Sequence, residues 1–260
     1  MKVTYLGIDL LVPVLKALLE EGCEIQKLFT CPTDNVTEFN TEVLRIAGKH
    51  DIPYTMNKIT AEDIAQAEKE GCELLVCAGY YYRAPVSDTL PMVNFHPTFL
   101  PMGRGSWPMP RLILDRMPYG GITAHKMARD FDTGDILMRE RFSLDQKENL
   151  QSYMEKVYAR IPEMVHHLVT CLPELLAHAQ PQEGGEYWPA PTEADWTITP
   201  SMDAEEADCI LRAFYGYECV YHSGEQRTEL IGGRLFTGEN AGQAFPVKGG
   251  YILADKIRNL

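Results

Sequence analysis

The sequence predicts an α/β protein with a doubly wound, mostly parallel sheet and a small β-rich domain at its C-terminal end. In the first part of the chain, short apolar runs alternate with amphipathic helix patterns, which is the order expected of βαβ units. Residues 74–78 are apolar without alternation, as in a strand that helices cover on both faces. After a polar stretch rich in glycine at residues 180–185, the sequence changes to short β-like runs separated by glycines. We therefore expect one domain over residues 1–180 and a second over residues 181–260.

The individual elements follow from hydrophobic periodicity and helix breakers. Strands are expected at residues 3–6, 24–30, 53–56, 74–78, 121–127 and 136–142, with helices at residues 11–22, 39–50, 61–71 and 107–117. Asp9 precedes the first helix and is expected to cap it. Apolar residues at helical spacing between residues 150 and 168 predict one long helix kinked by Pro162. The second domain is expected to contain a helix at residues 203–214 and strands at residues 219–222, 228–231, 244–247 and 251–254.

The composition is that of a globular protein with reduced cysteines. The net charge of -13 disfavours extended contact with nucleic acid, because phosphate binding depends on Lys and Arg. Seven cysteines without a CxxC pair argue against both a disulfide framework and a structural zinc site. The N-terminus resembles a strand rather than a signal peptide, and the chain has no apolar run of membrane-spanning length. We expect a cytoplasmic protein that makes no contact with a membrane.

Two common nucleotide-binding signatures are missing from the sequence. The first βα turn, residues 6–10, has one glycine and no GxGxxG, which argues against NAD as a cofactor. The chain also lacks GxxxxGK[ST], the signature of the simplest nucleoside triphosphatases.

The first candidate site is an Asn-Phe-His-Pro sequence at the end of a predicted strand. On an extended segment Asn94 and His96 point to the same face, while Phe95 points to the other. An imidazole beside an amide can stabilise an oxyanion or carry a proton near neutral pH. The simpler alternative is that both side chains only fix the turn before Pro97, and this short motif alone does not exclude it.

The second candidate site is the turn that contains Asp132. An aspartate in such a turn often caps only its own backbone, but here Thr123 and His125 lead to the turn on a predicted strand. His125 by itself is more typical of a hydrogen-bonded structural histidine, and Asp135 is expected to be structural. A metal site made of these histidines and carboxylates is an alternative, although the sequence has no HExxH or HxH cluster.

Aromatic side chains form two further candidates for ligand contact. Residues 79–85 follow the central strand and include three tyrosines, whose backbone groups could read the edge of a flat heterocycle. Aromatic residues beyond the boundary, such as Trp188 and Trp196, could stack on a ligand, but in a small β-rich domain they more often form the core.

Taken together, these stretches resemble a known family. Residues 93–105 read VNFHPTFLPMGRG and residues 121–137 read GITAHKMARDFDTGDIL. This combination resembles the 10-formyltetrahydrofolate-dependent formyltransferases, which include methionyl-tRNA formyltransferase, glycinamide ribonucleotide formyltransferase and the sugar N-formyltransferases. The resemblance is closest over residues 70–145 and extends over residues 1–180. It implies a formyltransferase-type, Rossmann-like sheet.

The resemblance also implies the residues that carry the reaction. The catalytic triad would consist of Asn94, His96 and Asp132. The pterin of 10-formyltetrahydrofolate would be bound by two segments of main chain: Tyr82, Arg83 and Ala84, and Ala128, Arg129 and Asp130. No metal is expected. The chain departs from the family at two places. It has Thr98-Phe99 where relatives often have Ser-Leu. In residues 79–83 the order of basic and apolar residues is shifted relative to some family members, which affects the individual pterin contacts.

The chemistry agrees with this assignment. A neutral amine would attack the formyl carbon and an oxyanion would form. Asn94 and protonated His96 would stabilise the oxyanion, and Asp132 would orient His96 and relay the proton.

The nature of the acceptor amine is the least defined expectation. The tail looks like a reduced version of the one in the methionyl-tRNA and sugar enzymes, whereas glycinamide ribonucleotide enzymes usually end earlier. The acidic charge and a tail without a Lys/Arg run favour a nucleotide-linked amino sugar over initiator tRNA. Arg104 and Trp107 are expected beside the acceptor. A noncatalytic folate- or nucleotide-binding module is the other alternative, and the sequence leaves a homodimer open.

Overall fold

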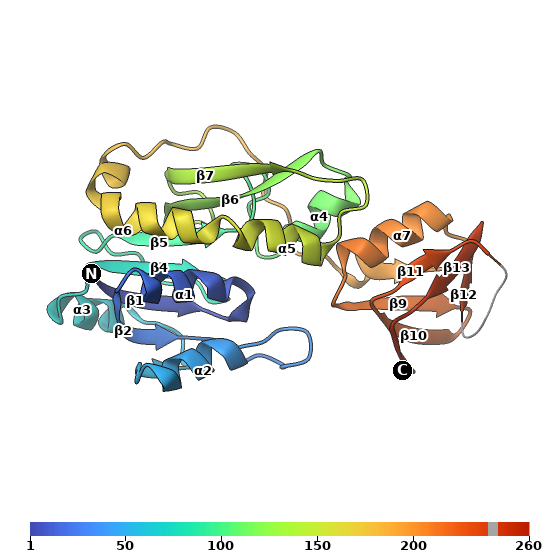
Figure 1. The fold of residues 1–260 in the computed structure, drawn as a ribbon, viewed down its shortest axis with the longest axis horizontal. Helices are drawn as coiled ribbons and strands as arrows, with labels where there is room; N and C mark the ends of the chain where they lie inside the picture. The colour runs from blue at the N-terminus through green and yellow to red at the C-terminus, as the bar shows by residue number, and fades with distance from the viewer. Residues whose placement is uncertain (239–243, 260) are drawn as a thin grey trace. The chain divides into compact units, whose positions relative to one another are not determined.

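The chain forms two compact units in a computed structural model that describes residues 1–238 and 244–259 (Figure 1). Unit 1 comprises Met1–Ser106, Gly121–Arg141 and Lys156–Trp188. Unit 2 comprises Trp107–Gly120, Phe142–Glu155 and Pro189–Leu260. The structure thus divides the chain differently from the expected boundary at residue 180. The last segment of unit 1 continues to Trp188, and two earlier segments belong to unit 2.

A seven-stranded sheet in the order β3-β2-β1-β4-β5-β6-β7 organises the fold. Its strands are β1 Lys2–Gly7, β2 Glu24–Phe29, β3 Tyr54–Thr55, β4 Leu74–Ala78, β5 Met92–His96, β6 Tyr119–Lys126 and β7 Ile136–Ser143. The first five strands pair in parallel, and β6 runs antiparallel to β5. Because β2 and β4 lie on opposite sides of β1, the topological switch point falls at the carboxyl ends of β1 and β4, where such sheets bind ligands.

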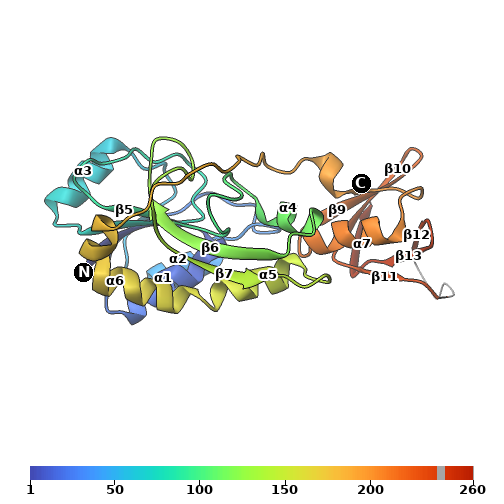
Figure 2. The same ribbon diagram turned by 90° about the horizontal axis from the view of Figure 1, so that it is seen from above.

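Helices cover both faces of this sheet, which confirms the doubly wound, mostly parallel fold. The helices before residue 180 are α1 Val12–Glu20, α2 Thr41–Lys49, α3 Ala61–Lys69, α4 Met109–Leu114, α5 Leu150–Tyr158 and α6 Ile161–Ala177, with a short 3-10 helix at Asp9–Leu11. In unit 1, α1 packs against α6, and α3 lies on the opposite face of the sheet (Figure 2). None of the helices in the described part of the chain has the length and apolar character needed to cross a membrane.

Two helix boundaries differ from the sequence-based expectation. Asp9 does not cap the helix that follows it, because its carboxylate accepts the N–H groups of Glu42 and Val43, both at 2.8 Å, at the start of α2. Pro162 does not kink one long helix, because α5 ends at Tyr158 and Pro162 lies in the first turn of α6. Proline is favoured there, since the N–H it lacks has no partner within the helix.

Unit 2 contains the expected β-rich C-terminal part. Its strands are β8 Thr197–Ile198, β9 Glu218–Ser223, β10 Gln226–Ile231, β11 Arg234–Phe236, β12 Phe245–Val247, β13 Gly250–Leu253 and β14 Lys256–Asn259. They form a four-stranded sheet, β14-β10-β9-β8, and a three-stranded sheet, β11-β13-β12. The helix α7, Ala204–Ala213, packs against α4 and follows the 3-10 helix Glu193–Trp196.

Candidate active site

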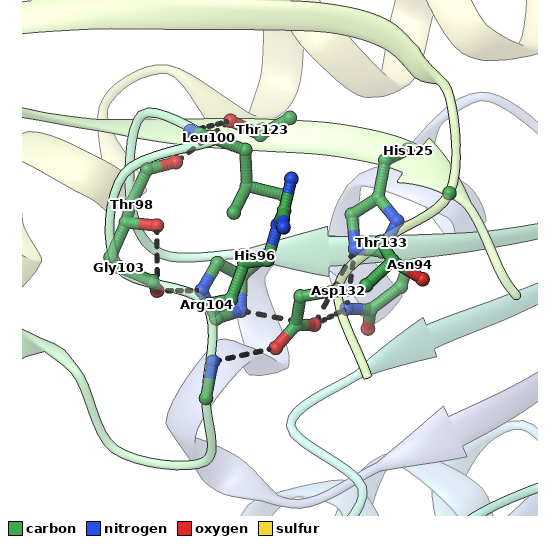
Figure 3. Close-up of polar contacts among 12 residues, drawn as sticks. Asn94, His96, Thr98, Leu100, Gly103, Arg104, Thr123, His125, Asp132 and Thr133 are labelled. Carbon is green, nitrogen blue, oxygen red and sulfur yellow. Dashed lines mark hydrogen bonds and ion pairs between the residues drawn. The ribbon is translucent and has the colours of Figure 1, made fainter. Parts of the chain in front are cut away.

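Strands β5 and β6 place four polar side chains next to one another. Asn94 and His96 lie at the carboxyl end of β5, and the antiparallel register sets His125 opposite Asn94 and Thr123 opposite His96. The period of two along each strand turns these side chains to one face of the sheet. The turn after β6 then brings Asp132 back to this group (Figure 3).

The Asp132 carboxylate is the centre of this cluster. Its Oδ1 lies 3.2 Å from Asn94 Nδ2 and 3.4 Å from His96 Nδ1. Its Oδ2 accepts a hydrogen bond of 2.9 Å from the N–H of Gly105. The structure therefore brings together Asn94, His96 and Asp132, the three residues that the family resemblance singled out.

The backbone of the turn holds Asp132 in an unusual conformation. Asp132 has φ 57°, in the left-handed region that costs a residue with a Cβ about 1–2 kcal/mol. Gly134 lets the turn approach β6, since a Cβ there would lie 1.8 Å from the carbonyl oxygen of Lys126. Such strain persists only where surrounding contacts fix it, as is common at active sites.

The environment of Asp132 keeps it ionised. Burial alone would raise the pKa of this carboxyl, but the charges of His96 and His125 and the hydrogen bond from Gly105 outweigh burial and lower that pKa to about 2. Asp132 is 9% exposed. The site thus contains a nearly buried carboxylate throughout the neutral pH range.

His96 faces an oxygen acceptor at each ring nitrogen. Its Nε2 lies 2.7 Å from the carbonyl oxygen of Gly103, which also accepts a hydrogen bond from Thr98. Because a carbonyl cannot donate, the hydrogen of the neutral ring belongs on Nε2, and Nδ1 then faces Asp132 without a hydrogen. A proton taken up at Nδ1 would complete the contact with Asp132.

The resting protonation state of His96 follows from its burial. Burial lowers the pKa of the His96 imidazole below its ordinary value, and the nearby charge of Asp132 offsets only part of this shift. The ring is therefore neutral near neutral pH. The protonated form arises when His96 accepts a proton.

His125 fixes the orientation of the Asn94 amide. Its Nδ1 lies 2.7 Å from the carbonyl oxygen of Lys126 and must donate to it, so in the neutral ring Nε2 is an acceptor. That Nε2 lies 3.1 Å from Asn94 Nδ2. The Asn94 N–H groups therefore point to His125 and Asp132. From the sequence alone, His125 was expected to be structural. Its spacing of two residues from Thr123 on the same strand was the signal that its side chain lies on the face of the site.

A family comparison decides how this site is classified. The sequence model of the family described as formyl transferase matches residues 33–169. The chain belongs to the formyl transferase family. The matched residues include all three side chains of the triad.

Individual known proteins are similar to most or all of the chain. A methionyl-tRNA formyltransferase from Rickettsia rickettsii (strain Iowa) is 26% identical over 234 residues, which cover 86% of this chain and 77% of that protein. HypX from Aquifex aeolicus, crystallised in complex with tetrahydrofolic acid, has a TM-score of 0.75 at 13% identity; the match covers all of this chain but 44% of HypX. An N-formyltransferase from Helicobacter canadensis, in complex with folinic acid and dTDP-3-aminofucose, has a TM-score of 0.66 at 14% identity, covering 97% of this chain and 98% of that chain. These structures share the fold of this formyl transferase.

The two segments expected to bind the folate of this formyl transferase are linked to each other. Arg83 pairs with Asp130 at 3.4 Å, which connects residues 82–84 with residues 128–130. Ala84 and Arg129 border a cavity of about 370 Å³, together with Lys58, Ile59, Arg83, Pro85 and Val86. Tyr82 packs edge-on against Tyr80, with ring centroids 5.5 Å apart. Ala128 is half-buried, two residues after the end of β6.

The two residues expected beside the acceptor contact other protein groups. Arg104 donates hydrogen bonds to Gln182 Oε1, at 3.0 Å, and to the carbonyl of Gly184, at 2.9 Å. Trp107, in unit 2, packs against three aromatic rings, those of Trp196, Phe214 and Tyr217. Arg104 and Trp107 thus have structural contacts of their own, whether or not they also meet an acceptor.

The His–carboxylate metal site has little support in this geometry. Within residues 1–238 and 244–259, no group of three or more His, Cys, Asp or Glu side chains is placed to hold a metal ion. Asp135, one of the four residues considered, pairs with Lys126 at 3.4 Å.

The neutral His96 leads to a prediction that does not depend on activity. We expect Asp132→Asn to lower the pKa of His96 further, because the Asp132 charge favours the imidazolium. NMR titration of the histidine ring protons measures this shift directly. A His96 pKa that rises or stays constant in the variant would show that the two groups do not interact as the 3.4 Å contact indicates.

Proposed function

We propose that this chain transfers a formyl group from 10-formyltetrahydrofolate to a primary amine, and that the amine belongs to a nucleotide-linked amino sugar. The observation that carries the proposal is the convergence of Asn94, His96 and Asp132, contributed by β5 and by the turn after β6. Membership in the formyl transferase family supports the reaction class.

The triad supplies what formyl transfer needs. The acceptor nitrogen attacks the formyl carbon, and the electrons of the C=O bond move to oxygen. An Asn94 N–H can stabilise them there once the amide releases its contact with Asp132 or His125. The new N–H⁺ loses a proton to the pair formed by Asp132 and neutral His96, whose Nδ1 faces the carboxylate. That proton passes to the folate nitrogen as its bond to carbon breaks and the carbonyl re-forms. The products are an N-formyl amine and tetrahydrofolate.

The charge around the cavity near Ala84 suits the tail of a folate. Lys58, Arg83 and Arg129 all border this cavity, and none of its lining residues is acidic. A folate ends in glutamate carboxylates, which such cations attract. We therefore propose that Tyr82–Ala84 and residues 128–130 bind the donor, with its carboxylates toward these three side chains.

This placement predicts an effect on donor binding. We expect Arg83→Ala to raise KM for 10-formyltetrahydrofolate roughly threefold with little change in kcat, because the side chain is half exposed and exposed charge contacts contribute under about 1 kcal/mol. The increase should shrink at high salt, where exposed charges are screened. Lys69→Ala, at the exposed end of α3, is the matched control and should leave KM unchanged. A change in kcat alone would contradict the placement.

The acidic charge of the chain supports the amino sugar as acceptor. The net charge of -13 is unfavourable for tRNA, whose binding depends on basic surface. The N-formyltransferase from Helicobacter canadensis, which has the same fold, was crystallised with dTDP-3-aminofucose. A methionyl-tRNA formyltransferase is the second candidate, supported by the 26% identity to the relative from Rickettsia rickettsii.

Incubation with 10-formyltetrahydrofolate and one acceptor at a time tests the proposal. We expect tetrahydrofolate release with a dTDP-linked amino sugar and a formylated sugar nucleotide in the mass spectrum. Release only with charged initiator tRNA would overturn the sugar assignment. Donor binding without release for any acceptor would favour a noncatalytic folate-binding module instead.

A further inference from the structure

One segment of unit 1 contacts both loops that surround the triad. These loops are the turn after β6, which contains Asp132, and the loop of residues 103–105, which follows β5. Residues 182–188, which we call the strap, follow α6, and the strap begins within the polar stretch 180–185 where the sequence predicts the domain boundary. The strap lies after residue 169, where the match to the family model ends.

Gln182 binds the catalytic turn through its amide. Its Nε2 donates to the carbonyl oxygens of Asp132, at 2.8 Å, and of Gly134, at 2.7 Å. Its Oε1 accepts the hydrogen bond from Arg104 Nε, at 3.0 Å. Two carbonyls and one guanidinium group fit only this orientation of the amide, because the carbonyls need donors and the guanidinium needs an acceptor.

The strap also binds the loop on the other side of the triad. The N–H of Trp188 donates to the carbonyl of Arg104 at 2.7 Å, and the N–H of Arg104 donates to the carbonyl of Glu186 at 3.3 Å. A Cβ on Gly105 would lie 2.2 Å from the carbonyl oxygen of Trp188, so the two backbones touch there. The two neighbours of Arg104 in this loop contact the triad directly. The Gly103 carbonyl binds His96, and the Gly105 N–H donates a hydrogen bond to Asp132.

We infer that Gln182 is a positioning residue that holds the Asp132 carboxylate against His96, a role that rests on the proposed formyl transfer. Asp132 has a left-handed backbone, which is unfavourable for a residue with a Cβ and needs external support. The two hydrogen bonds from Gln182 hold the carbonyls of Asp132 and Gly134 within this turn. Arg104 connects the same amide to the opposite loop, so its guanidinium acts through Gln182 in this arrangement.

The test compares two glutamines of the same segment. Gln182→Leu keeps the approximate size of the side chain and removes all three hydrogen bonds. Gln180→Ala is the matched control, since its side-chain amide donates to the carbonyl of His178 and not to the catalytic turn. With 10-formyltetrahydrofolate and a dTDP-linked amino sugar, we expect kcat to fall between about tenfold and a hundredfold in Gln182→Leu. KM for the donor should remain within about twofold, and Gln180→Ala should behave as wild type.

A titration of His96 separates positioning from general destabilisation. The titratable groups near the His96 ring are Asp132 and His125. If Gln182→Leu moves the carboxylate away, the pKa of His96 falls, as it should in Asp132→Asn. An unchanged His96 titration in a folded Gln182→Leu variant overturns the inference, even if kcat is reduced. Should that variant not fold, Gln182→Met, which also lacks both donors and adds no charge, gives the same test.

The titration also separates this inference from the proposed function. A His96 shift in a protein that transfers no formyl group would refute the reaction and leave the role of Gln182 intact. Normal formyl transfer with no His96 shift in Gln182→Leu would refute the role of Gln182 alone.

Discussion

Replacing Asp132 with asparagine should lower kcat about a thousandfold. Asparagine keeps the shape of the side chain but removes the charge and the proton acceptor, and loss of a positioned acid–base group typically costs a factor of 10²–10⁴. The carboxylate is 9% exposed and lies within 3.4 Å of both Asn94 Nδ2 and His96 Nδ1, so solvent cannot easily replace it. Tetrahydrofolate release at saturating substrates measures the effect.

Asp135→Asn is the control for this substitution because it lies in the same turn. Its carboxylate is 42% exposed and pairs with Lys126 at 3.4 Å, and exposed pairs of this kind contribute little. We expect kcat within about twofold of wild type. Comparable losses in both variants would indicate that the turn, and not the Asp132 carboxylate, determines the rate.

The order of strands and helices could be predicted from sequence because it depends on local periodicity. The buried strand β4 and the alternation before it were sufficient for the doubly wound sheet. The partner of Asp9 could not be predicted, since an aspartate after a strand can cap any helix N-terminus that packs nearby, and here it is α2. Pro162 presents the same difficulty, because a proline that kinks one helix and a proline that starts another give the same apolar pattern.

The site was predictable where the sequence carries a recognisable motif and not where contacts arise from folding. Asn94, His96 and Asp132 were identified from their motifs, and the structure brings them together. Gln182 was not identified, since nothing in the polar, glycine-rich stretch 180–185 shows that one amide binds two carbonyls 48 and 50 residues earlier in the chain. Trp107 was assigned beside the acceptor, but its aromatic partners Trp196 and Phe214 come from distant segments that only the fold brings to it.

Asn94→Ala should lower kcat at least about a hundredfold, because it removes the amide proposed to stabilise the oxyanion. Asn94→Asp is the more informative variant. The present geometry sets Asn94 Nδ2 3.2 Å from Asp132 Oδ1, and a carboxylate at that position would place two like charges in contact. We expect this variant to be as inactive as Asn94→Ala near neutral pH. Its kcat should recover partly at lower pH, where one shared proton removes the repulsion.

A substitution of His125 distinguishes orientation of the Asn94 amide from its chemistry. His125→Gln removes the ring that accepts an Asn94 N–H at 3.1 Å but leaves the contact between Asn94 and Asp132. We therefore expect a smaller loss, on the order of tenfold, because the charge-assisted hydrogen bond to Asp132 still holds the amide. Measurement of kcat for Asn94→Ala, Asn94→Asp and His125→Gln distinguishes the two roles. If His125→Gln lowers kcat as much as Asn94→Ala does, then His125 itself takes part in proton transfer. The proton would in that case be shared between His96 and His125.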